Sequence, residues 1–168
     1  MTEQQRYTVV ETVREDPVVE LREYSPCTVA DVVVMGGLER AANAGFGPLV
    51  SYISANNLAM TAPVLQESAP QQDSWLVSFV LPGGRLPEAY PLPTDARVSL
   101  RELPAQRALA LRWSGRWTEQ ALAKRTTELL AVAAQQDLRP VGEVRWARYD
   151  PPWTPPFMRR NEVIVTVA

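Results

Sequence analysis

Glu162 is the residue of this sequence best suited to acid–base chemistry. In the segment 163–167 the odd positions are valine, so Glu162 and Ile164 share one face of a strand and the valines occupy the other. If the Glu162 face lines a groove, this carboxyl is buried, as functional carboxyls often are. As a general base it would need a polar neighbour to position a substrate, and the candidates are Tyr52, Tyr149 and Asn161. No nucleophile motif, phosphate-binding loop or metal-ligand spacing accompanies these residues, so binding is the favoured interpretation over catalysis.

Arg159 and Arg160 follow a proline-rich turn and form the second candidate group. A guanidinium is a planar donor that suits carboxylates, so this pair could hold an anionic ligand. The alternative is a solvated loop in which the arginines pair with Glu162 or Asp150. The sequence leaves both interpretations open.

The third group is apolar and extends from a helical segment into the strand after it. Four of its members share a helical face, and the fifth opens the strand Met-Thr-Ala-Pro-Val. Such a set forms either a hydrophobic core or the wall of a ligand groove. The five residues are Phe46, Leu49, Tyr52, Ile53 and Met60.

Composition excludes several classes of protein. The chain has 168 residues, one Cys and no His, with 17 Lys+Arg against 19 Asp+Glu. Without histidine, His-based triads and His-ligated zinc or haem are impossible, and a single cysteine allows no internal disulfide. The net charge of −2 argues against nucleic-acid binding, which needs a concentrated positive field. With neither a signal peptide nor a membrane-length apolar run, we expect a cytoplasmic protein whose residues 1–168 form one domain.

The residue pattern predicts four strands and one helix in the first half of the chain. The helix covers Leu38 to Ala55, and Pro48 suits a first helical residue at which it would restart. A polar loop from Ser68 to Ser74 joins the last two strands as a hairpin. The predicted strands are 18–24, 28–34, 59–66 and 75–81.

The second half repeats this plan. Leu21-Arg22-Glu23 recurs as Leu100-Arg101-Glu102, each time with a proline close behind. The same offset places a second helix from Trp117 to Ala134, opened by a Thr118 cap. Its strands are expected near 100–102, 108–113, 141–149 and 162–167. An internal duplication with halves of about 18–82 and 97–167 explains this agreement. The fold class is therefore α+β, with two pseudo-symmetric ββαββ halves whose strands form a curved antiparallel sheet flanked by two helices.

Four segments together resemble a known family. They are Gly45-Phe46 with Leu49, Tyr52-Ile53 and Asn56-Asn57; Met60 to Val64; Trp75 to Pro82; and Tyr149 to Val163. In this order, and preceded by Glu20 to Tyr24, they are similar to the SOUL family of haem-binding proteins. The resemblance covers Val18 to Val167, and it implies a fold of two pseudo-symmetric halves that form a distorted β-barrel flanked by two helices.

The resemblance implies reversible binding of haem or a related porphyrin in an apolar groove, in a carrier or buffer role. One branch of the family is thought to use a His ligand and another only hydrophobic contacts and basic residues; this His-free chain resembles the second. The cofactor-binding residues would then be the five apolar residues of the third group together with Arg159, Arg160 and Glu162. Met60, Cys27 and the phenols of Tyr52 and Tyr149 are weaker candidates as iron ligands.

Two other functions compete with this one. The family is distantly similar to the effector domains of multidrug-responsive regulators, which hold cationic drugs on an acidic residue, and some of their relatives are hydrolases. Glu162 would be the residue in the pocket in either case. A third possibility is a protein-interaction module anchored on tryptophans, namely Trp75, Trp113, Trp117, Trp146 and Trp153. The sequence does not indicate an oligomeric state.

Overall fold

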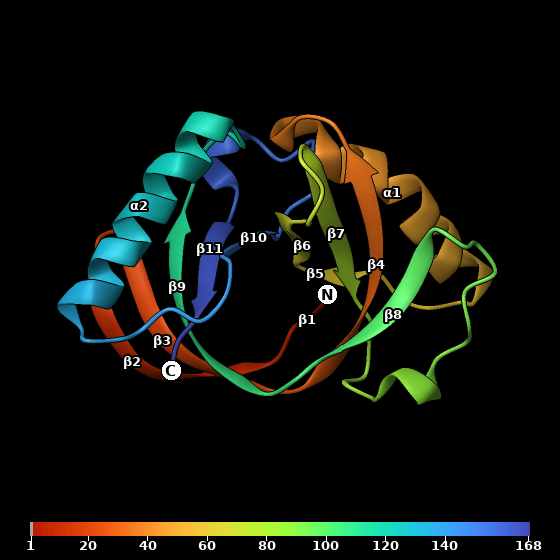
Figure 1. The fold of residues 1–168 in the computed structure, drawn as a ribbon, viewed down its shortest axis with the longest axis horizontal. Coiled ribbons are helices and arrows are strands. Elements are labelled where there is room, and N and C mark those ends of the chain that lie inside the picture. The colour runs from red at the N-terminus through yellow and green to blue at the C-terminus, as the bar shows by residue number, and fades with distance from the viewer. Residues whose placement is uncertain (1) are drawn as a thin grey trace. The chain divides into compact units, whose positions relative to one another are not determined.

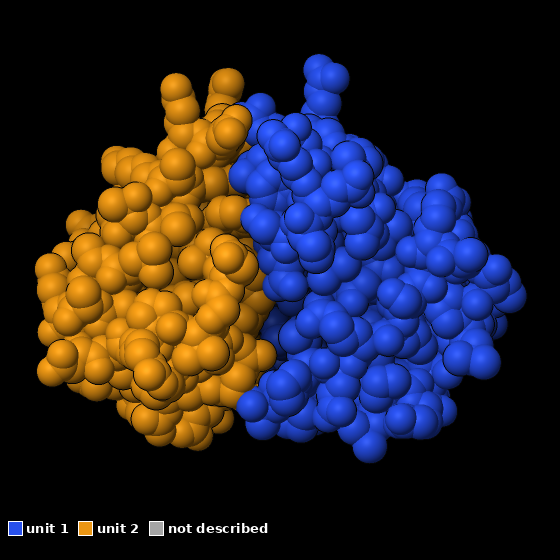
Figure 2. Space-filling view, in the orientation of Figure 1, with its two compact units in different colours: residues 1–6, 25–105 blue, residues 7–24, 106–168 orange. Residues whose placement is uncertain are grey.

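A computed structural model describes residues 2–168 and divides the chain into two compact units. Unit 1 comprises residues 1–6 and 25–105, and unit 2 comprises residues 7–24 and 106–168 (Figure 2). The chain passes from one unit to the other after Arg6, Tyr24 and Ala105. Each unit contains its own sheet and its own helix.

Unit 1 is an antiparallel sheet with one helix on it. Its strands are β4 (Cys27–Met35), β6 (Val64–Ser68), β7 (Ser74–Val80) and β8 (Val98–Leu103), in the order β6-β7-β4-β8. Helix α1 (Leu38–Ala55) packs on β4, β7 and β8 (Figure 1). The short strands β1 (Glu3–Gln4) and β5 (Thr61–Ala62) pair in parallel, and a 3-10 turn, η1, covers Pro87–Ala89.

Unit 2 has the same plan. Its strands are β2 (Tyr7–Glu15), β3 (Val18–Tyr24), β9 (Gln106–Trp113), β10 (Arg145–Arg148) and β11 (Asn161–Thr166), in the order β2-β3-β9-β11-β10. Helix α2 (Glu119–Gln135) packs on β9 and β11 (Figure 1). A proline-rich loop containing a 3-10 turn, η2 (Pro156–Met158), joins β10 to β11.

The α+β class with two helices and antiparallel strands is confirmed, but the β-barrel expectation is wrong. Strand β2 is an edge of the sheet in unit 2, and β8 is an edge of the sheet in unit 1. Within the described residues β2 pairs with β3 alone and β8 with β4 alone. A closed barrel requires every strand to have two partners, so these edge strands exclude it.

The expected element order ββαββ occurs twice, with pairings that the sequence did not indicate. The strands flanking Pro26 do not pair with each other: β3 pairs with β9 in unit 2, and β4 pairs with β8 in unit 1. The repeated tripeptide has a structural counterpart, since Arg22 pairs with the carboxylate of Glu162 and Arg101 with that of Asp31. The duplication itself stays a prediction.

Both helices lie where they were expected. Helix α1 runs unbroken through Pro48 rather than restarting there, and Gly45 lets it approach the sheet, because a Cβ at this position would lie 2.9 Å from the Cβ of Val77. Helix α2 begins after its N-cap Thr118, whose side chain accepts a hydrogen bond from the Ala121 N–H.

Three strand predictions need correction. The expected strand 59–66 is divided at Pro63, which has no N–H to donate, into β5 and β6. The expected strand 141–149 contains only the four residues of β10. Strand β2 was not predicted, because it is an exposed edge strand with no buried apolar alternation.

The core of unit 1 lies between α1 and the sheet. It joins Leu49, Tyr52 and Ile53 of the helix to Val32 and Val77 of the strands. In the part of the chain that the structure describes, no helix is long and apolar enough to cross a membrane.

Candidate functional site

Glu162 is completely buried, and the alternation in β11 places it on the strand face away from the valines, as expected. Its side chain is 0% exposed and lies on the opposite sheet face from the buried Val163 and Val165. In the adjacent strands Arg112 and Ala147 stand opposite it. A carboxylate in this position requires charged partners to offset its lost hydration.

Arg22 is the principal partner of Glu162. Its two terminal nitrogens donate to the two carboxylate oxygens at 2.8 and 2.7 Å, and it also bonds Glu20 and the hydroxyl of Tyr24. Strand alternation in β3 places these side chains on one face, and Arg22 stands opposite Ala108 of β9, a side chain small enough to leave it room. Arg22 is 0% exposed, so this is a fully buried bidentate ion pair.

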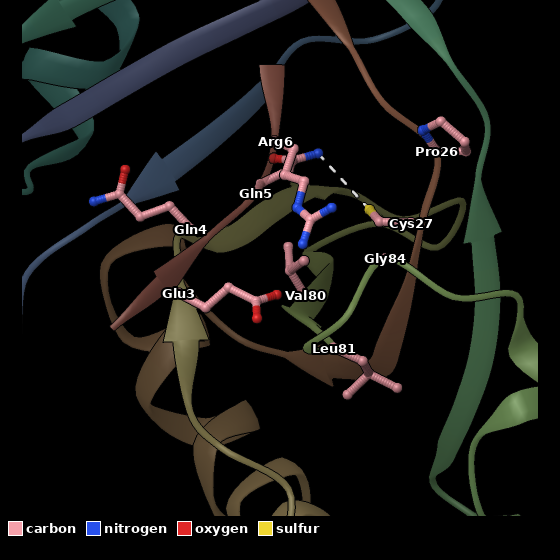
Figure 3. A pocket seen from close by; sticks show the side chains of 9 residues that line it. All are labelled: Glu3, Gln4, Gln5, Arg6, Pro26, Cys27, Val80, Leu81 and Gly84. Carbon is pink, nitrogen blue, oxygen red and sulfur yellow. Dashed lines mark hydrogen bonds between the residues drawn. The ribbon is translucent and has the colours of Figure 1, made fainter. Parts of the chain in front are cut away.

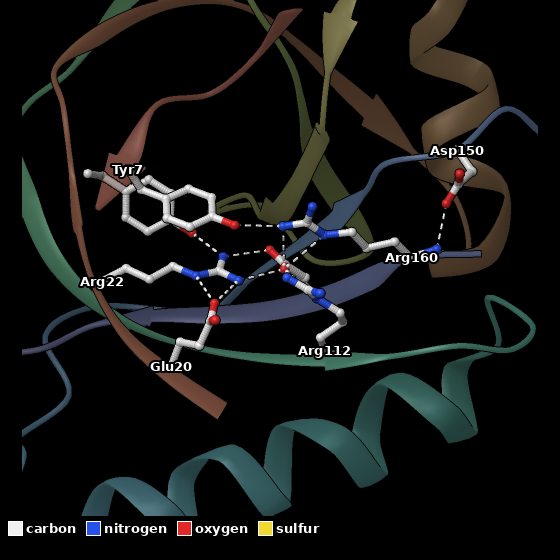
Figure 4. Close-up of polar contacts among 8 residues, drawn as sticks. Tyr7, Glu20, Arg22, Arg112, Asp150 and Arg160 are labelled. Carbon is white, nitrogen blue, oxygen red and sulfur yellow. Dashed lines mark hydrogen bonds and ion pairs between the residues drawn. The ribbon is translucent and has the colours of Figure 1, made fainter. Parts of the chain in front are cut away.

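Two further arginines approach the same carboxylate. Arg160 donates to Glu162 at 3.0 Å and to the Tyr7 hydroxyl at 2.8 Å, and Arg112 lies 3.6 Å from Glu162. In Figure 4 the guanidinium groups of Arg22, Arg112 and Arg160 point toward a common centre. The name Glu162 cluster is used below for Glu20, Arg22, Arg112, Arg160 and Glu162.

The cluster holds one more positive than negative charge. Burial alone would raise the pKa of Glu162, but hydrogen bonds and charge from Arg22, and then from Arg160, outweigh it and lower the pKa below its ordinary value. The carboxylate is therefore ionised, saturated with donors and a poor general base. Arg112 and Arg160 keep 38% and 25% of their side chains exposed, so the excess charge is accessible.

Tyrosine rings surround these cations. Arg22 lies 4.1 Å over the ring of Tyr7, and Arg160 lies 3.9 Å over that of Tyr149. Burial raises the pKa of Tyr24 to about 12 and that of Tyr149 well above its ordinary value. These side chains are neutral phenols, and a ferric ligand would need the phenolate.

The predicted apolar wall lies in unit 1, and most of it is core. Leu49, Tyr52 and Ile53 are at most 7% exposed, and the Tyr52 hydroxyl donates to the Pro91 carbonyl. Phe46 packs edge-on against Phe79 beside this core. Only Met60 stands apart, 39% exposed. The structure thus brings four of the five together, and their role as a ligand wall stays a prediction.

Adjacent Arg159 and Arg160 have different surroundings. The Arg160 side chain pairs with Glu162, one of the two partners that the loop interpretation named, but Glu162 is buried rather than solvated. The contact of Arg160 with Asp150 is made by its backbone N–H and not by its side chain. Arg159 instead donates to the carbonyls of Pro152 and Thr154, so it braces the proline-rich loop. An anion-binding role for either is not tested by these contacts.

Sequence reasoning missed Arg22, Arg112 and Tyr7. In β3 the alternation of Val19 and Leu21 with charged residues suggests a solvated outer face, yet Arg22 is buried. The Leu-Arg-Glu repeat is the sequence feature that could have indicated Arg22, because both of its arginines form ion pairs with buried carboxylates.

Two cavities lie within unit 1. One, of about 10 Å3, adjoins Cys27, whose sulfur accepts a hydrogen bond from Gln5 at 4.0 Å (Figure 3). The other, of about 150 Å3, lies between α1 and the Pro93 loop and includes Tyr52. Pockets for drug-sized ligands measure roughly 300–1,000 Å3, so neither holds a tetrapyrrole as it stands. The described residues contain no cluster of three groups able to hold a metal ion.

The model of the SOUL heme-binding protein family matches residues 2–166, so the chain belongs to this family. No curated protein matches the chain.

Solved structures share the fold at low identity. The C-terminal domain of EcmrR is 14% identical with a TM-score of 0.70, over 89% of this chain and 96% of that one. A hydrolase from Listeria innocua is 12% identical with a TM-score of 0.59, over 89% and 91%. SAV2435, solved with tetraphenylphosphonium bound, is 13% identical with a TM-score of 0.52, over 89% and 93%.

Proposed function

We propose that this chain binds haem or a related tetrapyrrole reversibly, without a histidine ligand, as a carrier or buffer. Membership of the SOUL family supports the ligand class. The observation that carries the proposal is the excess positive charge of the Glu162 cluster, with Arg112 and Arg160 partly exposed. Tetrapyrroles of this kind carry carboxylates on an apolar disc, and guanidinium groups beside aromatic rings suit both parts.

Arg112 is the principal candidate to receive a ligand carboxylate. Its one ion pair among the described residues is the 3.6 Å approach of its buried Nε to Glu162, which is too long for a hydrogen bond, and 38% of its side chain is exposed. Arg160 has fewer donors left for a ligand than Arg112, because it already donates to Glu162 and to the Tyr7 hydroxyl. Arg22 is fully used and buried, so it positions Glu162 and does not meet the ligand.

The residues fit the porphyrin better than its iron. Bound haem would supply a redox-active iron, but the sequence has no His, and Tyr149 is a neutral phenol. Affinity would come from burying the porphyrin faces, about 25 cal/mol per Å2 of apolar surface, with arginines fixing the orientation. Metal-free porphyrin should therefore bind about as tightly as haemin.

The apolar residues of unit 1 form a separate part of the proposal. Phe46 and Met60 have exposed surface and are the members that could touch a porphyrin. Leu49, Tyr52 and Ile53 would act only by holding α1 in place, because they are buried in the core.

A cationic ligand is the alternative, raised by the shared fold with SAV2435. An acidic residue attracts a cation only if its charge is available. Here Arg22, Arg112 and Arg160 surround Glu162, and the net field of the cluster is positive. The same neutralisation disfavours a hydrolase in which Glu162 is the general base.

The test is a Soret-region absorbance titration with haemin and with protoporphyrin, beside an albumin control for nonspecific uptake. We expect one saturable site for each ligand, and binding about tenfold or more weaker in Arg112→Gln, because hydrogen bonds to charged groups are worth about 1.5–3 kcal/mol. Arg107→Gln is the matched control, since Arg107 lies on the same strand in an exposed pair with Glu23. Saturable binding of tetraphenylphosphonium but of neither porphyrin would replace this proposal with the cationic alternative.

A further inference from the structure

Three side chains of unit 2 form a second polar group, which the Glu162 cluster does not include. Trp113 of β9 and Arg148 of β10 both stand opposite Asn161 of β11. Because side chains alternate along a strand, this row points to the opposite sheet face from Glu162, the next residue of β11. Trp117 stacks on Trp113 with ring centroids 6.3 Å apart and an interplanar angle of 11°. Trp113, Trp117 and Arg148 are called the tryptophan–arginine stack below.

Each member of the stack has a buried N–H without a partner. Trp113 is 6% exposed and Trp117 is 8% exposed, and neither indole nitrogen has a hydrogen-bond partner among the described residues. The Nε of Arg148 is likewise buried and unpartnered. The large majority of buried side-chain polar atoms in native proteins are hydrogen-bonded, so three donors without an acceptor in one contact group call for an explanation.

Arg148 also differs from Arg22 and Arg101 in its charge balance. It lies 4.3 Å over the ring of Trp117, and no carboxylate among the described residues forms an ion pair with it, whereas Arg22 pairs with Glu20 and Glu162, and Arg101 with Asp31. Burial, and then the nearby charge of Arg159, lower the pKa of Arg148 to about 10. Arg148 therefore remains a cation at neutral pH, and the like charge of Arg159 repels it.

The local backbone holds the stack at the start of α2. Trp117 directly precedes the N-cap Thr118, where the helix presents the positive end of its dipole. The Asn161 side chain donates to the carbonyl of Gly115 at 3.0 Å, and Gly115 has a φ of 134°, so the turn before Trp117 is fixed. The acid of the first helical turn, Glu119, is exposed.

We propose that the tryptophan–arginine stack binds a small oxyanion, a carboxylate or phosphate group, through the guanidinium of Arg148 and the indole N–H groups of Trp113 and Trp117. A water molecule could accept hydrogen bonds from the indoles but would leave the guanidinium without a counter-charge. An oxyanion supplies both the hydrogen-bond acceptors and the negative charge. This site does not depend on tetrapyrrole binding, because it lies on the other face of the sheet and needs no aromatic ligand.

The experiment follows the indole N–H signals of the full chain by two-dimensional 1H–15N NMR. The protein is titrated separately with sodium phosphate, sodium acetate and sodium chloride at equal ionic strength. We expect the Trp113 and Trp117 signals to move saturably with phosphate, acetate or both, and not with chloride. The difference between the first two arms identifies the kind of oxyanion. Trp113→Phe and Trp117→Phe assign the signals, and each replaces the indole by a smaller aromatic ring without an N–H donor.

Variants separate this site from general charge effects. Arg148→Gln should weaken oxyanion binding about tenfold or more, because it removes the charged donor. Arg116→Gln removes an exposed charge beside Trp117 and should change binding less than about twofold, since exposed charges are screened by salt. Indole signals that respond to neither oxyanion, or that respond equally in the two arginine variants, would overturn the proposal. If Arg148→Gln does not fold, Trp117→Phe is compared with Arg116→Gln instead, because it removes one proposed donor and leaves the Trp113 indole signal to report oxyanion binding.

Discussion

The most informative stability prediction concerns Glu162→Gln. The variant keeps the shape of the side chain but leaves Glu20 as the one remaining carboxylate of the cluster beside Arg22, Arg112 and Arg160. Buried Arg22 loses its bidentate partner, and Arg160 loses its 3.0 Å partner. Removing one partner of a buried ion pair typically costs about 3–5 kcal/mol. Single domains are stable by about 5–15 kcal/mol, so we expect a large but measurable loss.

Urea denaturation at a series of pH values measures this loss. The pKa of Glu162 is lower in the folded chain than in the unfolded one. Its carboxylate therefore contributes its full stability above the ordinary glutamate pKa of about 4.3, and loses it as the pH falls through the folded value. The difference between the parent and Glu162→Gln should be constant at neutral pH and narrow only below about pH 4.

Glu23→Gln is the control for this prediction. Glu23 pairs with Arg107 at 3.0 Å, but both side chains are at least half exposed. Such pairs contribute about 0–1 kcal/mol. If Glu162→Gln costs no more than Glu23→Gln, the buried ion pair is not what stabilises this face of the sheet, and the reasoning fails.

Three further predictions concern packing and capping. Gly45→Ala should destabilise the chain, because its Cβ would lie 2.9 Å from a valine Cβ on β7, and overpacking of about 1–3 kcal/mol exceeds the gain in helix propensity. Gly47→Ala, whose Cβ contacts nothing, should stabilise the chain by up to about 1 kcal/mol. Equal effects of the two substitutions in urea denaturation would contradict this reasoning. Thr118→Ala should cost about 1 kcal/mol through loss of the α2 cap, measured in the same way, and an unchanged midpoint would show that the cap contributes nothing. Leu49→Ala should cost about 2–5 kcal/mol, and a comparable loss in the exposed Met60→Ala would place Met60 in the core as well.

Local sequence features predicted the elements but not their partners. The helices were predictable because each has an apolar stripe, and α2 also has a Thr118 cap. The pairing of β3 with β9, and of β4 with β8, was not, because a proline turn between two strands does not say whether they form a hairpin or separate. The closed barrel came from a family resemblance, and the open strand order corrects it.

The candidate site was predictable only at Glu162. Alternation in β11 places Glu162 away from the valines and predicts a buried acid if that face lines a groove, and Arg160 was a named partner. Arg22 is distant in sequence, and its own strand suggests a solvated side chain. Its burial depends on the pairing of β3 with β9, which is a property of the tertiary fold.

Comparing protoporphyrin with its dimethyl ester would test the central claim most directly. The ester keeps the apolar disc and removes both carboxylate charges. If Arg112 and Arg160 receive those carboxylates, esterification should weaken binding to the parent by about tenfold or more, and should have little further effect in Arg112→Gln. Equal affinity of the acid and the ester for the parent protein would contradict the account.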